Sequence, residues 1–147
     1  MSTISVIMPV YIGEPDSDVI ITDSAIKSLR STTDIKFELV IAEVEGERFK
    51  PMADVHIRTE GLGKIQRDLN QAIEASSGDY VVVTGNDIIV RRGLKLPDGS
   101  RMGWLEALVQ PFLLFKDCGL TSLSAREGGG TLIGPGQPMA LIVESIY

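Results

Sequence analysis

Polar residues that could do chemistry follow a short, strongly apolar stretch of the sequence. Residues 80–84 read Tyr-Val-Val-Val-Thr and run directly into Gly85, Asn86 and Asp87. Polar residues that follow a buried strand lie at the carboxyl edge of an open α/β sheet, where ligands usually bind. The sequence therefore predicts a ligand site around these three residues.

A second candidate lies where Gly61 and Gly63 precede a stretch of helical spacing. Free backbone amides at a helix start can hold phosphate oxygens, and Lys64 and Arg67 could contact a diphosphate or a base. The stretch lacks the rest of a dinucleotide fingerprint and the Lys-Thr ending of a P-loop, and a solvated helix face is an equal alternative for both cations. Tyr11 ends the first apolar run, so it could border a nucleobase or pack in the core.

The scarce residue types exclude several chemistries. His56 is the only histidine and Cys118 the only cysteine. Neither a zinc site built on several histidine or cysteine ligands nor an internal disulfide can form. His56 lies in an extended stretch, where a structural or surface role is favoured over that of a catalytic base. The lone cysteine favours a reducing compartment, and we expect a cytoplasmic protein.

Length and composition bound the fold class. The chain has 147 residues, of which 44% are hydrophobic and 23% charged, which fits one α/β domain with a sizeable core. Fourteen Lys and Arg against 20 Asp and Glu give a net charge of -6, which argues against a nucleic-acid partner. No apolar run approaches the roughly 20 residues of a membrane span, and no basic signal-peptide region begins the chain.

The elements that must position these residues alternate between strand and helix. Short β-branched runs predict four buried strands, and longer stretches of helical spacing predict three helices. The strands are expected at 5–11, 37–43, 55–58 and 80–84, and the helices at 17–31, between Gly63 and Gly78, and at 104–116. Ser17 or Asp18 could cap the first helix. This order predicts a three-layer, mainly parallel, Rossmann-like sheet.

The last third of the sequence gives weaker signals. Pro97-Asp98-Gly99 predicts a small hairpin before the third helix, and Pro111 could kink that helix. Residues 119–124 and 139–143 predict two further strands, separated by a glycine-rich loop at 128–136.

Five segments occur in an order that is typical of one enzyme family. They are SVIMPVY at 5–11, AIKSL at 25–29, FELVIAE at 37–43, the stretch from Gly61 to Asp87, and WLEAL at 104–108. Together they resemble the nucleotide-binding half of the family 2 glycosyltransferases, which have the GT-A fold. The resemblance covers residues 4–116. It implies one shortened GT-A-type domain over residues 1–147, in which the acceptor-binding half is largely absent.

This resemblance implies a nucleoside-diphosphate sugar as donor, of the UDP-linked type, with Mg²⁺ or Mn²⁺ balancing the charge of the diphosphate. Asp87 matches the final aspartate of the family's acidic motif and is the candidate metal ligand, and an Asx turn is the alternative role. Glu43 matches the aspartate that accepts from the nucleobase, and a solvated carboxylate is its alternative. The nucleotide-binding candidates are Pro9, Tyr11, Glu43, Gly63, Lys64, Arg67 and Asn86.

The sequence departs from the family pattern in three places, namely at two motifs and in how little follows the acidic motif, where the family has its catalytic base and acceptor-binding half. Gly85 stands where the family has an earlier aspartate, which predicts weaker metal binding. Glu43-Val44-Glu45-Gly46 stands where the family has two aspartates followed by glycine and serine. No catalytic base is assigned, because Glu144 is the sole acidic residue after Glu127.

The leading interpretation is a glycosyltransferase that transfers a sugar to an unknown acceptor. The alternative is a non-catalytic GT-A-like binding or assembly module. A nucleotidyltransferase is disfavoured, because residues 12–17 contain no Lys or Arg for a phosphate loop. We also expect a homo-oligomer, since a shortened relative would expose apolar surface near residues 139–143.

Overall fold

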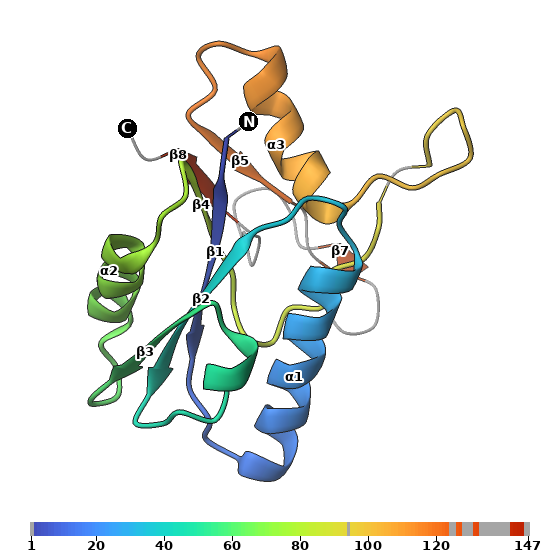
Figure 1. Cartoon of the computed structure of the whole chain (residues 1–147). Coiled ribbons are helices and arrows are strands. Elements are labelled where there is room, and N and C mark those ends of the chain that lie inside the picture. The colour runs from blue at the N-terminus through green and yellow to red at the C-terminus, as the bar shows by residue number, and fades with distance from the viewer. Residues whose placement is uncertain (1, 94, 124–125, 128–130, 133–141, 146–147) are drawn as a thin grey trace.

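A six-stranded sheet in the order β3–β2–β1–β4–β8–β5 forms the centre of the computed structural model, which describes residues 2–93, 95–123, 126–127, 131–132 and 142–145 (Figure 1). The four parallel strands are β1 (Ile4–Val10), β2 (Glu38–Val44), β3 (Val55–Thr59) and β4 (Tyr80–Val83). Strand β8 (Ile142–Ser145) runs antiparallel to both β4 and β5 (Leu120–Ser122). The predicted α/β class with a mainly parallel sheet is confirmed.

The helices follow the predicted order. They are α1 (Pro15–Ser31), the short 3₁₀ helix η1 (Lys50–Met52), α2 (Ile65–Ala75) and α3 (Trp104–Leu114). Strands β6 (Arg126–Glu127) and β7 (Thr131–Leu132) form a separate antiparallel pair. No helix in the described part of the chain combines the length and apolar character of a membrane span.

Helix α1 begins two residues before the predicted start, and this corrects the expected cap. Pro15 occupies the first turn, where its fixed φ and missing N–H are tolerated. The carboxylate of Asp18 reaches back and accepts hydrogen bonds from the backbone N–H groups of Gly13 and Glu14, at 2.9 and 2.8 Å. The bond from Glu14, with that from Gly13, holds the pKa of Asp18 below its ordinary value. Asp18 thus fixes the loop that joins β1 to α1.

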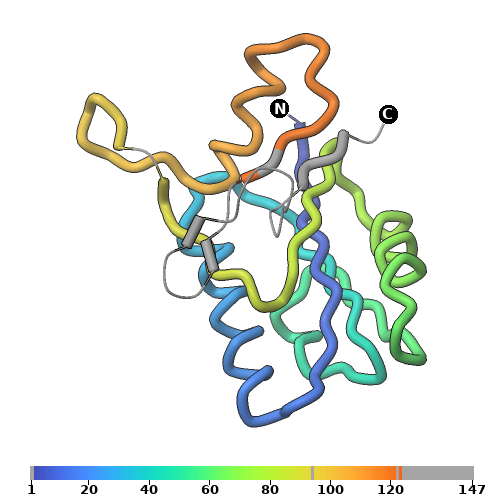
Figure 2. Tube along the Cα trace, turned by 180° about the vertical axis from the view of Figure 1, so that it is seen from behind, coloured from blue at the N-terminus to red at the C-terminus, as the bar shows by residue number. Residues whose placement is uncertain are grey.

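Helices lie on both sides of the sheet, which makes three layers (Figures 1 and 2). Apolar side chains pack on both of its faces. On one face, α1 and α3 contribute residues such as Leu29 and Leu105 to a cluster with alternate residues of β1, β2 and β4. On the other face, Ala72 of α2 packs with the intervening strand residues. The strand residues that we expected to be buried are Val6, Ile7, Val40, Ile41, Val82 and Val83. All are buried except Val83, the last residue of β4, which is partly buried.

The segment between β4 and α3 contains the expected turn. Lys95 and Arg101 form an isolated antiparallel bridge around Gly99, whose φ of 87° suits glycine. Pro111 lies inside α3. The glycine-rich stretch 128–136 lies outside the described residues except for 131–132, and the expected strand at 139–143 is described only at 142–143, which belong to β8.

Candidate functional site

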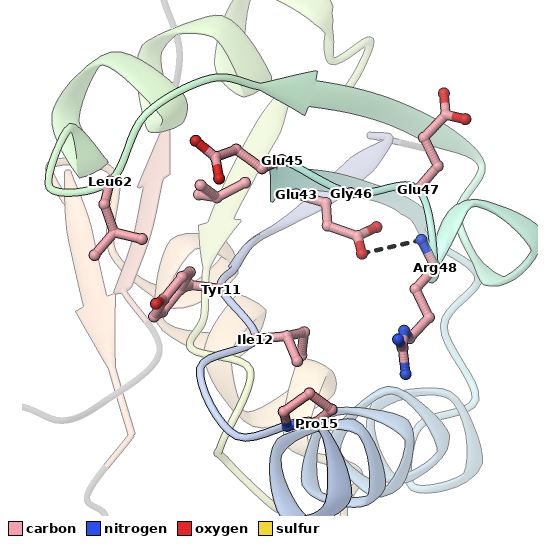
Figure 3. A pocket seen from close by; sticks show the side chains of 10 residues that line it. Tyr11, Ile12, Pro15, Glu43, Glu45, Gly46, Glu47, Arg48 and Leu62 are labelled. Atoms are coloured by element: carbon pink, nitrogen blue, oxygen red, sulfur yellow. Dashed lines mark hydrogen bonds between the residues drawn. The ribbon is translucent and has the colours of Figure 1, made fainter.

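The loops that follow the parallel strands meet at one edge of the sheet, toward which β1, β2 and β3 point at the bottom of Figure 1. In open α/β sheets, ligands bind outside the carboxyl ends of the strands. A cavity of about 550 Å³ opens at this edge, between the loops after β1 and β2 (Figure 3). We call it the edge cavity. Its lining residues are Tyr11, Ile12, Pro15, Glu43, Val44, Glu45, Gly46, Glu47, Arg48 and Leu62.

Glu43, the last but one residue of β2, is the most constrained polar side chain of the edge cavity. The residue is only 2% exposed. Its Oε1 accepts from the backbone N–H of Arg48 at 3.0 Å, and its Oε2 accepts from that of Phe49 at 3.1 Å. Nε2 of His56 lies 2.9 Å from the same Oε2. These contacts fix the loop after β2 against the sheet.

Close packing against Glu43 explains the glycine in this loop. A Cβ added to Gly46 would lie 2.8 Å from Oε1 of Glu43, which is closer than real Cβ contacts. Glu45, just before it, has a φ of 53°, which is uncommon for a residue with a side chain. Its amide donates to the carbonyl oxygen of Thr59 at 2.7 Å, and its Oε1 accepts from the N–H of Gly61 at 3.3 Å. The loops after β2 and β3 are therefore joined at the cavity mouth.

The other described residues that line the edge cavity are mostly apolar, and Glu47 and Arg48 add one charge of each sign. Tyr11 is 49% exposed and Leu62 is 58% exposed, so both side chains are available to a ligand. In Figure 3 they lie on the same side of the cavity, with Ile12 and Pro15 below them and the guanidinium of Arg48 opposite. This combination of a flat ring, apolar walls and a few polar groups is typical of small-molecule sites.

Asp87 and Asn86 follow β4, on the other side of β1 from the edge cavity. Asp87 is exposed, and no described residue donates a hydrogen bond to its carboxylate. Nδ2 of Asn86 donates to Oγ1 of Thr22 at 3.0 Å, which leaves the amide oxygen of Asn86 available. A Cβ added to Gly85 would lie 2.8 Å from Oδ1 of Asp87, so the Asp87 carboxylate folds back over this glycine.

The start of α2 carries the other predicted contacts. Gly61 and Gly63 have φ values of 81° and 76°, which favour glycine. Lys64 is exposed and occupies the N-cap position of the helix. Arg67 donates through Nε and Nη2 to Oδ1 of the buried Asp68, at 3.0 and 2.7 Å. This ion pair holds Arg67 against the helix.

The remaining predicted residues have plainer surroundings. Pro9 lies within β1, paired in register with Ala42 of β2. Arg92, after β4, forms an ion pair with Asp34 at 2.8 Å. Among the described residues, no group of three or more His, Cys, Asp or Glu side chains could hold a metal ion.

Of the residues that line the edge cavity, the sequence predicted only Tyr11 and Glu43; the polar or exposed ones that it missed include Glu45, Glu47, Arg48 and Leu62. Each lies in the loop that follows a strand. Because ligands bind outside the carboxyl ends of the strands, a search that extended from the strand ends into these loops would have included them. The sequence also indicated no hydrogen-bond partner for His56. The pairing of Ile41 with His56 in the parallel register places this ring beside Glu43, and this register cannot be read from one strand alone.

The fold and the cavity define an α/β, Rossmann-like domain with a candidate ligand site at the carboxyl edge of its sheet. The bifunctional IspDF from Campylobacter jejuni is similar over 98% of this chain and 41% of its own, with a TM-score of 0.53 and 14% identity. The mannosyltransferase PcManGT from Pyrobaculum calidifontis, solved with GDP-Man and Mn²⁺, is similar over 60% of this chain and 28% of its own, with a TM-score of 0.44 and 20% identity.

The chain therefore spans less than half the length of either solved structure. At these identities the likeness shows the fold alone. No protein-family model matches the chain, and no curated protein matches it.

Proposed function

We propose that this chain is a nucleotide-binding domain of glycosyltransferase type, which binds a nucleoside-diphosphate sugar. The observation that carries the proposal is the edge cavity, which lies at the carboxyl ends of β1 and β2 with Asp87 beyond the next strand, β4. A base held beside Tyr11 would direct its diphosphate along this edge toward Asp87. The ordered sequence resemblance to the family 2 glycosyltransferases supports the same assignment.

Asp87 and Asn86 are suited to bind a divalent cation whose remaining ligands come from the diphosphate of the nucleotide sugar. Magnesium commonly takes only one or two protein carboxylates and completes its octahedron with substrate phosphates and water. The exposed carboxylate of Asp87 and the available oxygen of Asn86 are ligands of this kind. When bound, such a cation would offset the charge on the leaving diphosphate.

A second candidate function is binding without transfer. Gly85 favours it, because the glycine leaves Asp87 without the second carboxylate that the family pattern places at this position. With a single carboxylate we expect weak affinity, with a Kd on the order of 10⁻⁴ M, or about 5.5 kcal/mol.

Titration calorimetry with nucleoside diphosphates and their sugar conjugates, with Mn²⁺ and with chelator, tests the proposal. We expect tighter binding with Mn²⁺, and Asp87→Ala should remove this dependence on the cation. Asp117→Ala, at an exposed carboxylate beyond α3, is the matched control and should behave as the parent protein. Absence of heat at millimolar nucleotide with Mn²⁺ would contradict the proposal. Sugar release from the bound donor would favour the transferase over the binding module.

A further inference from the structure

The polar side chains of the edge cavity are mostly hydrogen-bond acceptors. Among the described residues that line it, three are glutamates, Glu43, Glu45 and Glu47, and Arg48 is the only cation. A carboxylate that is ionised can only accept hydrogen bonds. A ligand that fills this cavity must therefore present N–H donors rather than further oxygens.

Glu43 holds its carboxylate in a fixed position at the inner wall of the cavity. Its Oε2 receives two donors, from Phe49 and His56, whereas Oε1 receives the single N–H of Arg48. Gly46 packs closely against this oxygen and Glu43 is only 2% exposed, so Glu43 contributes the negative charge of the inner wall rather than an open contact. Figure 3 shows the Glu43 carboxylate directed into the cavity.

Glu45 supplies an accessible acceptor close to the apolar wall. The hydrogen bond from the N–H of Gly61 occupies its Oε1, and Oε2 is left for a ligand. In Figure 3 its side chain lies on the same side of the cavity as Tyr11 and Leu62. A flat ring that packs against Tyr11 would thus have acceptors along its edge, while Arg48 offers a donor across the cavity.

From this arrangement we propose that the edge cavity selects guanine among the nucleobases. The Watson–Crick edge of guanine carries a ring N–H beside an amino group, which suits carboxylate acceptors, and a carbonyl oxygen, which suits the Arg48 guanidinium. Uracil presents one N–H between two carbonyl oxygens, and these would face carboxylates. Adenine and cytosine present an amino group beside a ring nitrogen that itself needs a donor.

The same charges exclude the diphosphate from the cavity. The three glutamates outweigh the single arginine, and this excess of negative charge repels the phosphates, which we place outside the cavity, toward Asp87 and a cation. This inference rests on the proposed function, and it replaces the UDP-linked donor of the sequence resemblance with a guanosine diphosphate sugar.

A comparison of four nucleotides with Mn²⁺ present tests base choice separately from nucleotide binding. The probes are GDP, UDP, ADP and inosine diphosphate, which is GDP without the amino group. We expect GDP to bind at least about tenfold more tightly than UDP or ADP, with inosine diphosphate between them. Equal affinity for all four, or a preference for UDP, would overturn guanine selection and leave the proposed function standing. Failure of all four to bind would overturn both.

Two variants test whether residues of the edge cavity determine the preference for guanine. Glu45→Gln keeps the size of the side chain but replaces the anionic acceptor, and it should lower the GDP-to-UDP affinity ratio severalfold. Glu60→Gln is the matched control, because Glu60 is exposed and does not line the cavity, and its ratio should not change. A ratio that Glu45→Gln leaves unaltered would contradict the role given to this residue. Glu45 is exposed, so this variant tests the cavity without removing the buried Glu43.

Discussion

At the scale of single residues, the pair formed by Glu43 and His56 organises the candidate site. Both side chains are nearly inaccessible, with exposed fractions of 3% and 4%. The carboxylate receives two backbone N–H groups of the loop after β2 in addition to the imidazole. A buried carboxylate that loses a hydrogen-bond partner retains its desolvation cost, so the pair must be kept together.

His56→Ala should therefore lower the free energy of unfolding by about 1–3 kcal/mol, because one oxygen of Glu43 loses its side-chain donor inside the protein. Urea unfolding measures this change. Arg58→Ala, at the exposed position two residues further along β3, serves as control and should change stability by less than about 0.5 kcal/mol. Equal, small effects of both substitutions would show that the Glu43–His56 contact contributes little.

The sequence predicted which residues lie at the ends of the strands, but not the contacts that their side chains make there. Asp87, Glu43 and Tyr11 were placed at the ligand edge because each follows a buried strand. The ion pair that holds Arg67 to Asp68 and the reach of Asp18 back to Gly13 depend on side-chain geometry that strand ends do not specify. Whether Glu43 contacts a base remains a prediction.

At the scale of elements, the start of α3 holds the end of α1. Nε1 of Trp104 donates to the carbonyl oxygen of Leu29 at 2.8 Å, and its backbone N–H donates to that of Thr32 at 3.3 Å. Glu106 accepts from Oγ1 of Thr33 and from the N–H of Asp34, at 2.8 and 2.7 Å. The last carbonyls of a helix have no partners within the helix, and Trp104 supplies one from another element.

Trp104→Phe should remove this indole hydrogen bond and leave the Leu29 carbonyl oxygen buried, at a cost of about 1–3 kcal/mol. Circular dichroism should follow the unfolding, since Trp104 is the only tryptophan and its fluorescence disappears with it. Leu113→Ala, at a residue of α3 that is 79% exposed, is the control and should have little effect. A stability equal to that of the parent would mean that the indole N–H does not hold the two helices together.

Most helices and strands were predictable, because the spacing of apolar residues that indicates each of them lies within its own stretch of sequence. The four parallel strands and three helices lie close to the expected residues, since β-branched runs and helical periodicity are read directly from the sequence. The pairing of β8 with β4 was not predicted. It joins Val83 to Ile142 across a long separation in sequence, and no local pattern specifies such a partner or its antiparallel direction.

At the scale of the whole molecule, the sheet separates two hydrophobic clusters. Ile26 belongs to the cluster under α1 and α3, and Ile7 to the cluster under α2. Both side chains are fully buried. Because β1, β2 and β4 contribute to both clusters, the two faces should unfold together even though their side chains pack separately.

Ile26→Val and Ile7→Val should each cost about 0.5–1.5 kcal/mol of unfolding free energy. The double variant should cost their sum to within about 0.5 kcal/mol, because side chains without shared partners contribute independently. Denaturant titrations of all four proteins test this in one cycle. A pairing of Ile26→Val with Ile41→Val, within one cluster, provides the contrast. Strong coupling between Ile26 and Ile7 would indicate that the sheet transmits packing changes between its faces.

The described residues that line the edge cavity all precede residue 63, whereas the candidate cation ligand, Asp87, follows a separate strand, β4. Substitutions within 43–48 therefore alter the surroundings of the base without touching β4, and substitutions at 85–87 alter the surroundings of the cation without touching the loop after β2. Under the proposed function, substrate choice and cation choice are separable traits. Each can be changed by mutation and selection on its own, on a scaffold that stays the same.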